Sequence, residues 1–306
     1  MARVYDVAVT VTFAAPIKVP TPDGRSLDVY VAGPDDGDVL VFHAGTPAVP
    51  LPYQPMIDQM AARGLRFVGF SRAGYGSSTR RQGRSVADVV GDTTAVLDHL
   101  GAKEAYVIGW SGGGPHALAC AALLPDRVHA AATIAGVAPY PAEGLDYLGG
   151  MGAENVEEFE AALAGPDQLI TFKERNWPIF RAVTGGEVAE SFGDLIDHVD
   201  AGALTGEFAE YIAACTREAL RESYWGWFDD DMAFINPWGF DLHSILVPVH
   251  VWQGGHDRMV PFAHGQWCAA NIPTAIPHLD EEDGHLRIVV QEMDDILDEL
   301  IASGRG

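Results

Sequence analysis

The sequence predicts an α/β fold, a mostly parallel twisted sheet flanked by helices, with a helical cap inserted into it. Apolar runs of strand length alternate with helix-like segments along residues 39–134, and the same alternation resumes at residue 247. The stretch between them lacks such runs. Repeated strand and helix units imply right-handed crossovers and a functional site at the carboxyl ends of parallel strands. We therefore expect a core of residues 1–138 and 235–306, and a helical cap of residues 139–234.

The strands are predicted from short apolar runs. Two of these, residues 17–19 and 27–31, flank the turn signal at residues 21–24 and indicate an antiparallel hairpin. The continuous run at residues 39–42 is typical of a strand buried on both faces of a sheet. Further strands are expected at residues 66–70, 105–108, 129–134, 247–252 and 275–279.

Helices are predicted where apolar residues recur with helical spacing between Gly and Pro residues. Those of the core are expected at residues 53–63, 85–100, 116–124, 262–270 and 286–301. Those of the cap are expected at residues 155–163, 168–183, 187–198 and 207–222.

The composition limits the classes of partner. The 306 residues include 43 acidic and 19 basic side chains, which give a formal net charge of -24. Such a surface repels phosphate backbones and anionic lipid, so we expect a small-molecule substrate, no nucleic acid and no membrane. Three widely spaced cysteines form no disulfide framework or metal motif, and neither a signal peptide nor a membrane-spanning run is predicted. A cytoplasmic protein is expected, and its oligomeric state stays open.

One short stretch carries the chemistry. A strand-like run leads into residues 109–113, Gly-Trp-Ser-Gly-Gly, and a helix-like segment follows. In such a strand, turn and helix the serine is exposed at the sheet edge, while the glycines leave room for the neighbouring elements. Ser111 is therefore the candidate nucleophile, and the Gly112 amide can face a developing negative charge. A purely structural Gly-rich turn is the alternative.

A serine hydroxyl needs a base, and that base needs an acceptor to hold its tautomer. Asp257 follows the strand predicted at residues 247–252, and His285 follows the next predicted strand. Nucleophile, acid and histidine thus occur in the order Ser111, Asp257, His285, each on a loop at one edge of the sheet. The acidic run at residues 280–283 offers an alternative acid.

These motifs resemble the α/β-hydrolase family, whose triad runs serine, acid, histidine in this order. The resemblance covers most of the chain outside the cap and the extreme N-terminus. Residues 43–47, His-Ala-Gly-Thr-Pro, are similar to the family's oxyanion loop with a residue added or shifted. The resemblance implies oxyanion donors on the backbone of Thr46 and Gly112, with Gly45 as the alternative to Thr46. Residues 70–78 are similar to a structural turn of the family, and a phosphate-binding loop is the weaker alternative.

The remaining candidate residues are aromatic, histidine and acidic side chains. We expect His43 to order the oxyanion loop, and we place His43, Trp110, Trp225 and Trp227 among the candidates for substrate binding. The cap concentrates aromatic residues, and ligand sites between domains are mostly apolar. Residues 229–231, Asp-Asp-Asp, are interpreted as a polar turn, because no partner at metal-ligand spacing accompanies them. No metal and no cofactor are expected.

The leading function is hydrolysis of a carboxylic ester or a related acyl substrate through an acyl-enzyme. The resemblance also allows aminopeptidases, carbon–carbon bond hydrolases and perhydrolases. Epoxide hydrolases and haloalkane dehalogenases of this fold use an aspartate nucleophile, so Ser111 argues against both. A non-catalytic receptor that keeps the fold is the alternative from another class. A dinucleotide-binding oxidoreductase is disfavoured, because no Gly-x-Gly-x-x-Gly follows the first buried strand.

Overall fold

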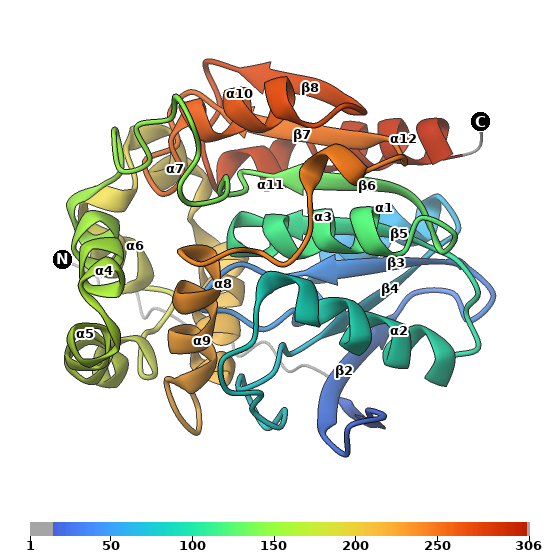
Figure 1. Ribbon diagram of the computed structural model, residues 1–306, viewed down its shortest axis with the longest axis horizontal. Coiled ribbons are helices and arrows are strands. Elements are labelled where there is room, and N and C mark those ends of the chain that lie inside the picture. The colour runs from blue at the N-terminus through green and yellow to red at the C-terminus, as the bar shows by residue number, and fades with distance from the viewer. Residues whose placement is uncertain (1–14, 305–306) are drawn as a thin grey trace, which may run out of the picture.

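The computed structural model describes residues 15–304, and a twisted sheet of eight strands forms its centre (Figure 1). The strands lie in the order β1-β2-β4-β3-β5-β6-β7-β8. The pairs β1–β2 and β2–β4 are antiparallel, and all other neighbours are parallel. The mostly parallel sheet is thereby confirmed, as is the hairpin at its edge. The strands are β1 (Ile17–Pro20), β2 (Ser26–Ala32), β3 (Asp38–His43), β4 (Leu65–Phe70), β5 (Ala105–Trp110), β6 (Val128–Ile134), β7 (Val249–Gly254) and β8 (Ala275–Asp280).

Helices cover both faces of the sheet, which explains why its central strands are apolar throughout. Leu40 and Phe42 of β3 pack into the core beneath one helical layer, whereas Val39 and Val41 pack beneath the other. One layer holds α1 (Gln54–Ala62), α11 (Arg287–Gln291) and α12 (Met293–Gly304). The other holds α2 (Val89–His99), α3 (Gly114–Leu123) and α10 (Phe262–Asn271).

Six further α-helices lie between β6 and β7 in the chain. Figure 1 shows that most of them gather at one end of the sheet. They are α4 (Ala153–Ala164), α5 (Pro166–Phe180), α6 (Val188–Phe192), α7 (His198–Ala203), α8 (Gly206–Ala219) and α9 (Trp225–Phe234). We refer to them as the α4–α9 segment. Its role as a separate cap with boundaries at residues 139 and 234 stays a prediction, and residues 1–14 of the expected core lie outside the described residues.

Two predicted helices are each divided in the structure. The helix expected over residues 187–198 ends at Phe192, because Gly193 adopts a φ of 51°. Asp197 then caps α7 by accepting a hydrogen bond from the Val199 amide at 2.8 Å. The helix expected over residues 286–301 is interrupted at Glu292, whose backbone angles of -98° and 2° are not helical.

The polar turn predicted at residues 229–231 is wrong. These three aspartates lie within α9, and all three are buried. Buried carboxylates require paired charges, and the chain supplies at least one cation for each. The partners are Arg80 for Asp229, Arg84 for Asp230 and Lys173 for Asp231. A run that is polar in the sequence is therefore part of an ion-paired interior.

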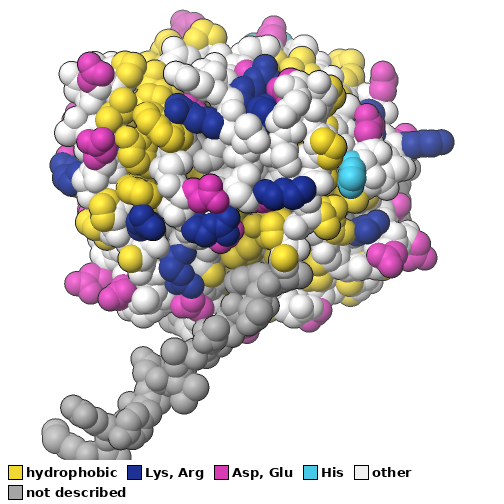
Figure 2. Space-filling model, turned by 90° about the horizontal axis from the view of Figure 1, so that it is seen from below, with side chains coloured by type: hydrophobic (Ala, Val, Ile, Leu, Met, Phe, Trp, Pro, Cys, Tyr) yellow, Lys and Arg dark blue, Asp and Glu magenta, His cyan; other side chains and the backbone are white. Residues whose placement is uncertain are grey.

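The surface carries both signs of charge despite the acidic composition. Figure 2 shows a face on which Lys and Arg side chains are interspersed with acidic and apolar ones. Within residues 15–304, no helix is both long and apolar enough to cross a membrane. The predicted absence of a signal peptide concerns the beginning of the chain, outside the described residues.

Candidate active site

Ser111 occupies a strained backbone position at the carboxyl end of β5. Its φ is 56°, a left-handed value that non-glycine residues rarely adopt. The chain passes from β5 through a single 3-10 turn into α3, and the neighbouring glycines make this turn possible. A Cβ on Gly109 would overlap the Gly113 carbonyl, and one on Gly113 would overlap the His43 carbonyl. Glycine is therefore required at both positions, as the sequence motif indicates.

Asp257 and His285 form a buried pair. The Nδ1 atom of His285 lies 2.8 Å from Oδ2 of Asp257. Gln253 Nε2 also donates to this oxygen at 2.8 Å, and Asp257 Oδ1 accepts the Val260 amide at 2.7 Å. The carboxylate is thus fixed by neutral donors as well as by the imidazole. Burial lowers the pKa of His285, but the negative charge on Asp257 raises it. The second effect is larger, so the pKa of His285 lies above its usual value.

The acidic run does not supply this partner. Asp283 is buried, but its Oδ1 accepts the Gly284 amide and lies 3.6 Å from Arg287. His285 Nδ1 contacts Asp257 instead, on the loop that follows β7.

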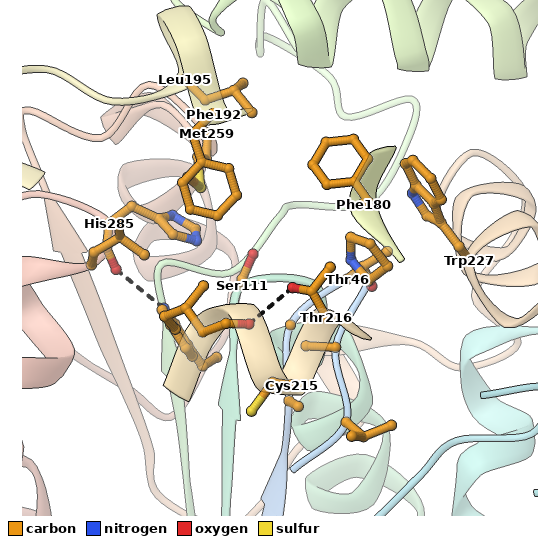
Figure 3. Close-up of a pocket in the computed structure, with 18 of the residues that line it drawn as sticks. Thr46, Ser111, Phe180, Phe192, Leu195, Cys215, Thr216, Trp227, Met259 and His285 are labelled. Carbon is orange, nitrogen blue, oxygen red and sulfur yellow. Dashed lines mark hydrogen bonds between the residues drawn. The ribbon is translucent and has the colours of Figure 1, made fainter. Parts of the chain in front are cut away.

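Ser111 and His285 line one cavity between the sheet and the α4–α9 segment. Figure 3 shows His285 and Met259 on one side of Ser111, with Phe180 and Trp227 on the other. The cavity volume of about 120 Å³ suits a small buried group. Its lining is mostly apolar, which is typical of ligand sites. Helices α4, α5, α6, α8 and α9 all contribute to it.

The loop after β3 is held by a buried arginine. Arg72 Nη1 donates to the Ala44 carbonyl at 2.5 Å, and Nη2 donates to the Gly45 carbonyl at 3.0 Å. In a trans peptide the N–H points opposite the carbonyl, so the amides of Gly45 and Thr46 are directed away from Arg72. Both residues line the cavity with Ser111. Gly112 lies against Thr46, because a Cβ there would collide with the threonine side chain.

A buried ion network supports this loop from behind. Asp230 of α9 pairs with Arg72 at 2.5 Å and with Arg84 at 2.6 Å. It also accepts hydrogen bonds from the hydroxyls of Thr46, at 2.7 Å, and Tyr75, at 2.8 Å. Burial raises the pKa of Asp230, but the two guanidinium charges outweigh it and hold the pKa well below the usual value. The turn at residues 70–78 therefore has the structural role that the sequence predicts.

The candidate substrate-binding residues separate into two groups. Trp110 and Trp227 line the cavity, and Trp110 Nε1 donates to the His285 carbonyl at 3.1 Å. His43 does not line it: its ring packs against Phe70 in the core, and its position next to Cys120 places it behind the sheet edge. Trp225 also lies outside the lining, where Arg80 stacks on its ring at 4.0 Å. We therefore retain neither His43 nor Trp225 as a substrate contact.

Asp200 is a residue that the sequence patterns do not reveal. This fully buried side chain of α7 accepts hydrogen bonds from three consecutive backbone amides, those of His285, Leu286 and Arg287, at 2.8–3.0 Å. Gly284 makes room for the carboxylate, since a Cβ there would overlap it. The loop that carries His285 is thus fixed by the α4–α9 segment.

Comparison with known proteins agrees with the fold. A family model described as the alpha/beta hydrolase fold matches residues 38–171. An esterase from Exiguobacterium antarcticum superimposes with a TM-score of 0.67 at 18% identity, over 95% of this chain and 100% of that one. The chain has the α/β-hydrolase fold.

Two curated relatives show how far the similarity extends. Epoxide hydrolase B from Mycobacterium tuberculosis is 32% identical over 154 residues, which cover 48% of this chain and only 42% of the relative. The match therefore spans less than half of that relative. A non-heme chloroperoxidase from Streptomyces lividans is 28% identical over 80% of this chain and 83% of its own length.

One further cluster of side chains has the residue types of a metal site. The ligand atoms of Asp197, His198 and His256 lie within 4.8 Å of one another. His256 Nδ1 is 2.6 Å from Asp197 Oδ2, so this histidine faces away from Asp257, its neighbour in the chain. The cluster connects the start of α7 to the loop after β7 that carries Asp257.

Proposed function

We propose that this protein is a serine hydrolase that cleaves a carboxylic ester or a related acyl substrate. The observation that carries the proposal is the Asp257–His285 pair at 2.8 Å, on the wall of the cavity that contains the strained Ser111. The two buried groups provide an oriented base, and the turn between β5 and α3 provides the hydroxyl of Ser111.

In the proposed reaction the Ser111 oxygen attacks the substrate carbonyl carbon while His285 Nε2 takes the hydroxyl proton. The negative Asp257 orients the ring and stabilises the imidazolium. The tetrahedral intermediate collapses, and the alcohol leaves with the proton from His285. Water then attacks the acyl-enzyme in the same way, which releases the acid and frees Ser111.

The oxyanion would be held by the backbone amides of Thr46 and Gly112, with Gly45 as the alternative donor. The carbonyl groups turned toward Arg72 support this assignment, because they leave the amides of the same peptides facing the opposite way. Preorganised donors of this kind supply a large part of transition-state stabilisation.

A serine nucleophile favours acyl transfer over epoxide opening. With an acyl substrate it forms an ester that water can hydrolyse, whereas its attack on an epoxide would leave an ether that water does not hydrolyse. The chloroperoxidase relative gives a reason to test hydrogen peroxide in place of water as the acceptor of the acyl group.

The test measures turnover of a panel of p-nitrophenyl esters by the wild type, Ser111→Ala and His285→Ala. We expect both variants to lose a factor of at least about 10⁴ in kcat, because members of a triad act as a unit. A fluorophosphonate probe should label the wild type and leave Ser111→Ala unlabelled.

Two results would contradict the proposal. Equal turnover by the wild type and Ser111→Ala would place the nucleophile elsewhere. A protein that hydrolyses no ester and resists the probe would instead fit a receptor that keeps the fold.

A further inference from the structure

An acidic side chain lies in the mostly apolar wall of the cavity. Among residues 15–304, Glu158 of α4 is the only carboxylate that lines the cavity with Ser111 and His285. The same side chain lines a smaller adjoining recess, together with Ser111, Gly112 and Asp231. A charge so close to the nucleophile bears directly on which substrates can enter.

Glu158 is held in place by two donors on one oxygen. Lys173 Nζ donates to Oε1 at 2.6 Å, and Trp227 Nε1 donates to the same atom at 2.5 Å. Lys173 is fully buried and lies 3.6 Å from the centre of the Trp227 ring. In residues 15–304 no N–H donor bonds to the second oxygen, Oε2, and the Asp231 carboxyl is the other group beside the Glu158 carboxylate. Oε2 can therefore accept a hydrogen bond from a ligand.

The cluster around Glu158 contains more acidic than basic groups. Lys173 also pairs with Asp231, so two carboxyl groups share one ammonium. Burial, followed by the nearby charge of Glu158, raises the pKa of Asp231 well above its usual value. A second cation beside Glu158 would bring the cluster to one cation for each of the two carboxyl groups.

We propose that Glu158 recognises an ammonium or other N–H donor on the substrate, so that this hydrolase prefers amino-substituted esters and rejects esters that carry a carboxylate. The inference rests on the proposed function and adds a substrate class to it. A charge in an apolar cavity interacts strongly, because little water screens it. A substrate carboxylate would meet Glu158 without a compensating donor, and such repulsion is an effective source of specificity.

The test compares three methyl esters of similar length, followed by titration of the released acid. Methyl 4-aminobutanoate carries an ammonium where methyl pentanoate carries a methyl group, and monomethyl succinate carries a carboxylate. For the wild type we expect the amino ester to exceed the pentanoate at least about tenfold in kcat/KM, and the succinate ester to be the poorest. Glu158→Gln should reduce the preference for the amino ester to near unity.

A matched control is available on the same helix. Glu157 is exposed and pairs with Arg175, so Glu157→Gln should keep the wild-type ratio. Glu158→Gln leaves Lys173 with one acidic partner fewer. A double variant, Glu158→Gln with Lys173→Met, removes both members of the pair, and it should also lose the preference for the amino ester. Thermal unfolding checks that each variant is folded.

The outcomes separate the two proposals. Hydrolysis of the neutral and amino esters at equal kcat/KM, or an unchanged ratio in both Glu158 variants, would overturn the role of Glu158 and leave the hydrolase function intact. If the wild type hydrolyses none of the esters and resists the fluorophosphonate probe, the proposed function itself fails.

Discussion

At the scale of single residues, the Asp257–His285 pair determines the pH range of the proposed reaction. His285 must be neutral to accept the Ser111 proton, and its pKa lies above the usual 6.5 because the charge on Asp257 outweighs the effect of burial. We therefore expect kcat/KM for a neutral ester to be low at acidic pH and to increase with pH, with the midpoint of the increase above about 6.5.

The variant Asp257→Asn tests this explanation. It removes the charge that raises the pKa of His285, so the rise in kcat/KM should move to lower pH, and the plateau should fall by about 10⁴. Stopped-flow or steady-state rates between pH 5 and 9 measure both effects. A profile that falls in height without moving would show that Asp257 is not the source of the shift.

Asp200 provides a second prediction at this scale. In Asp200→Asn the side-chain NH₂ would face backbone N–H groups that now donate hydrogen bonds to the carboxylate. The variant would also lose the negative charge of Asp200, which helps to raise the pKa of His285. We expect kcat to fall about 10- to 100-fold and the rise in kcat/KM to move to lower pH. Asp98→Asn, which alters an exposed ion pair with Arg127, is the control.

A role of Asp200 in folding alone would give a different result. The unfolding temperature would fall while the pH profile of the folded fraction stayed in place.

The triad candidates could be predicted from the sequence because each follows a predicted strand of one parallel sheet. Asp200 could not, since its partners are backbone amides, which leave no pattern of side chains. His43 and Trp225 were candidates by residue type, but their packing is decided by neighbours distant in the sequence, Phe70 and Arg80.

At the scale of the elements, the turn around Ser111 depends on backbone space. Gly113→Ala would place a Cβ on the His43 carbonyl, so β3 or α3 would have to move, and we expect a loss of several kcal/mol in the free energy of unfolding. Gly91→Ala is the matched control. Gly91 lies inside α2 with no atom within 4 Å of a Cβ, so alanine should stabilise the protein by about 0.5–1 kcal/mol.

Urea unfolding of both alanine variants measures these changes. Equal stability of the two variants would mean that the turn between β5 and α3 tolerates a side chain at residue 113.

Elements with a strong pattern were predicted better than those held by tertiary contacts. The buried strands β3 to β7 were found because apolar runs identify them. Helix α9 was missed, because its three aspartates look solvent-exposed until Arg80, Arg84 and Lys173 are brought to them by the fold. Helix α7 was missed because Gly193 and the cap at Asp197 lie inside a segment that has helical spacing.

At the scale of the whole molecule, buried histidines make stability depend on pH. Burial lowers the pKa of His116 and of His264 to about 4. In the unfolded chain these groups titrate near 6.5, so between pH 6.5 and 4 the unfolded state binds protons that the folded state does not. Their contribution to stability is present above pH 6.5 and is lost as the pH falls toward 4.

The variant His264→Gln isolates one of these groups. Between pH 6 and 5 the free energy of unfolding of the wild type should fall more steeply than that of the variant, by about 1.4 kcal/mol per pH unit. His198→Gln, at a largely exposed histidine, should keep the wild-type slope. Parallel curves for wild type and His264→Gln would show that His264 is charged in the folded protein.

The Arg72–Asp230 pair limits the exchange of the α4–α9 segment between related proteins. Arg72 lies in the turn after β4 and Asp230 in the α4–α9 segment, yet both hold the loop that contains Thr46. Exchanging the segment for that of a relative without a carboxylate at this place would leave a buried guanidinium with no counter-ion. The two parts are therefore not interchangeable modules. Substitutions on the faces of α4, α5 and α8 that line the cavity can change substrate specificity, because they do not alter the Arg72–Asp230 pair.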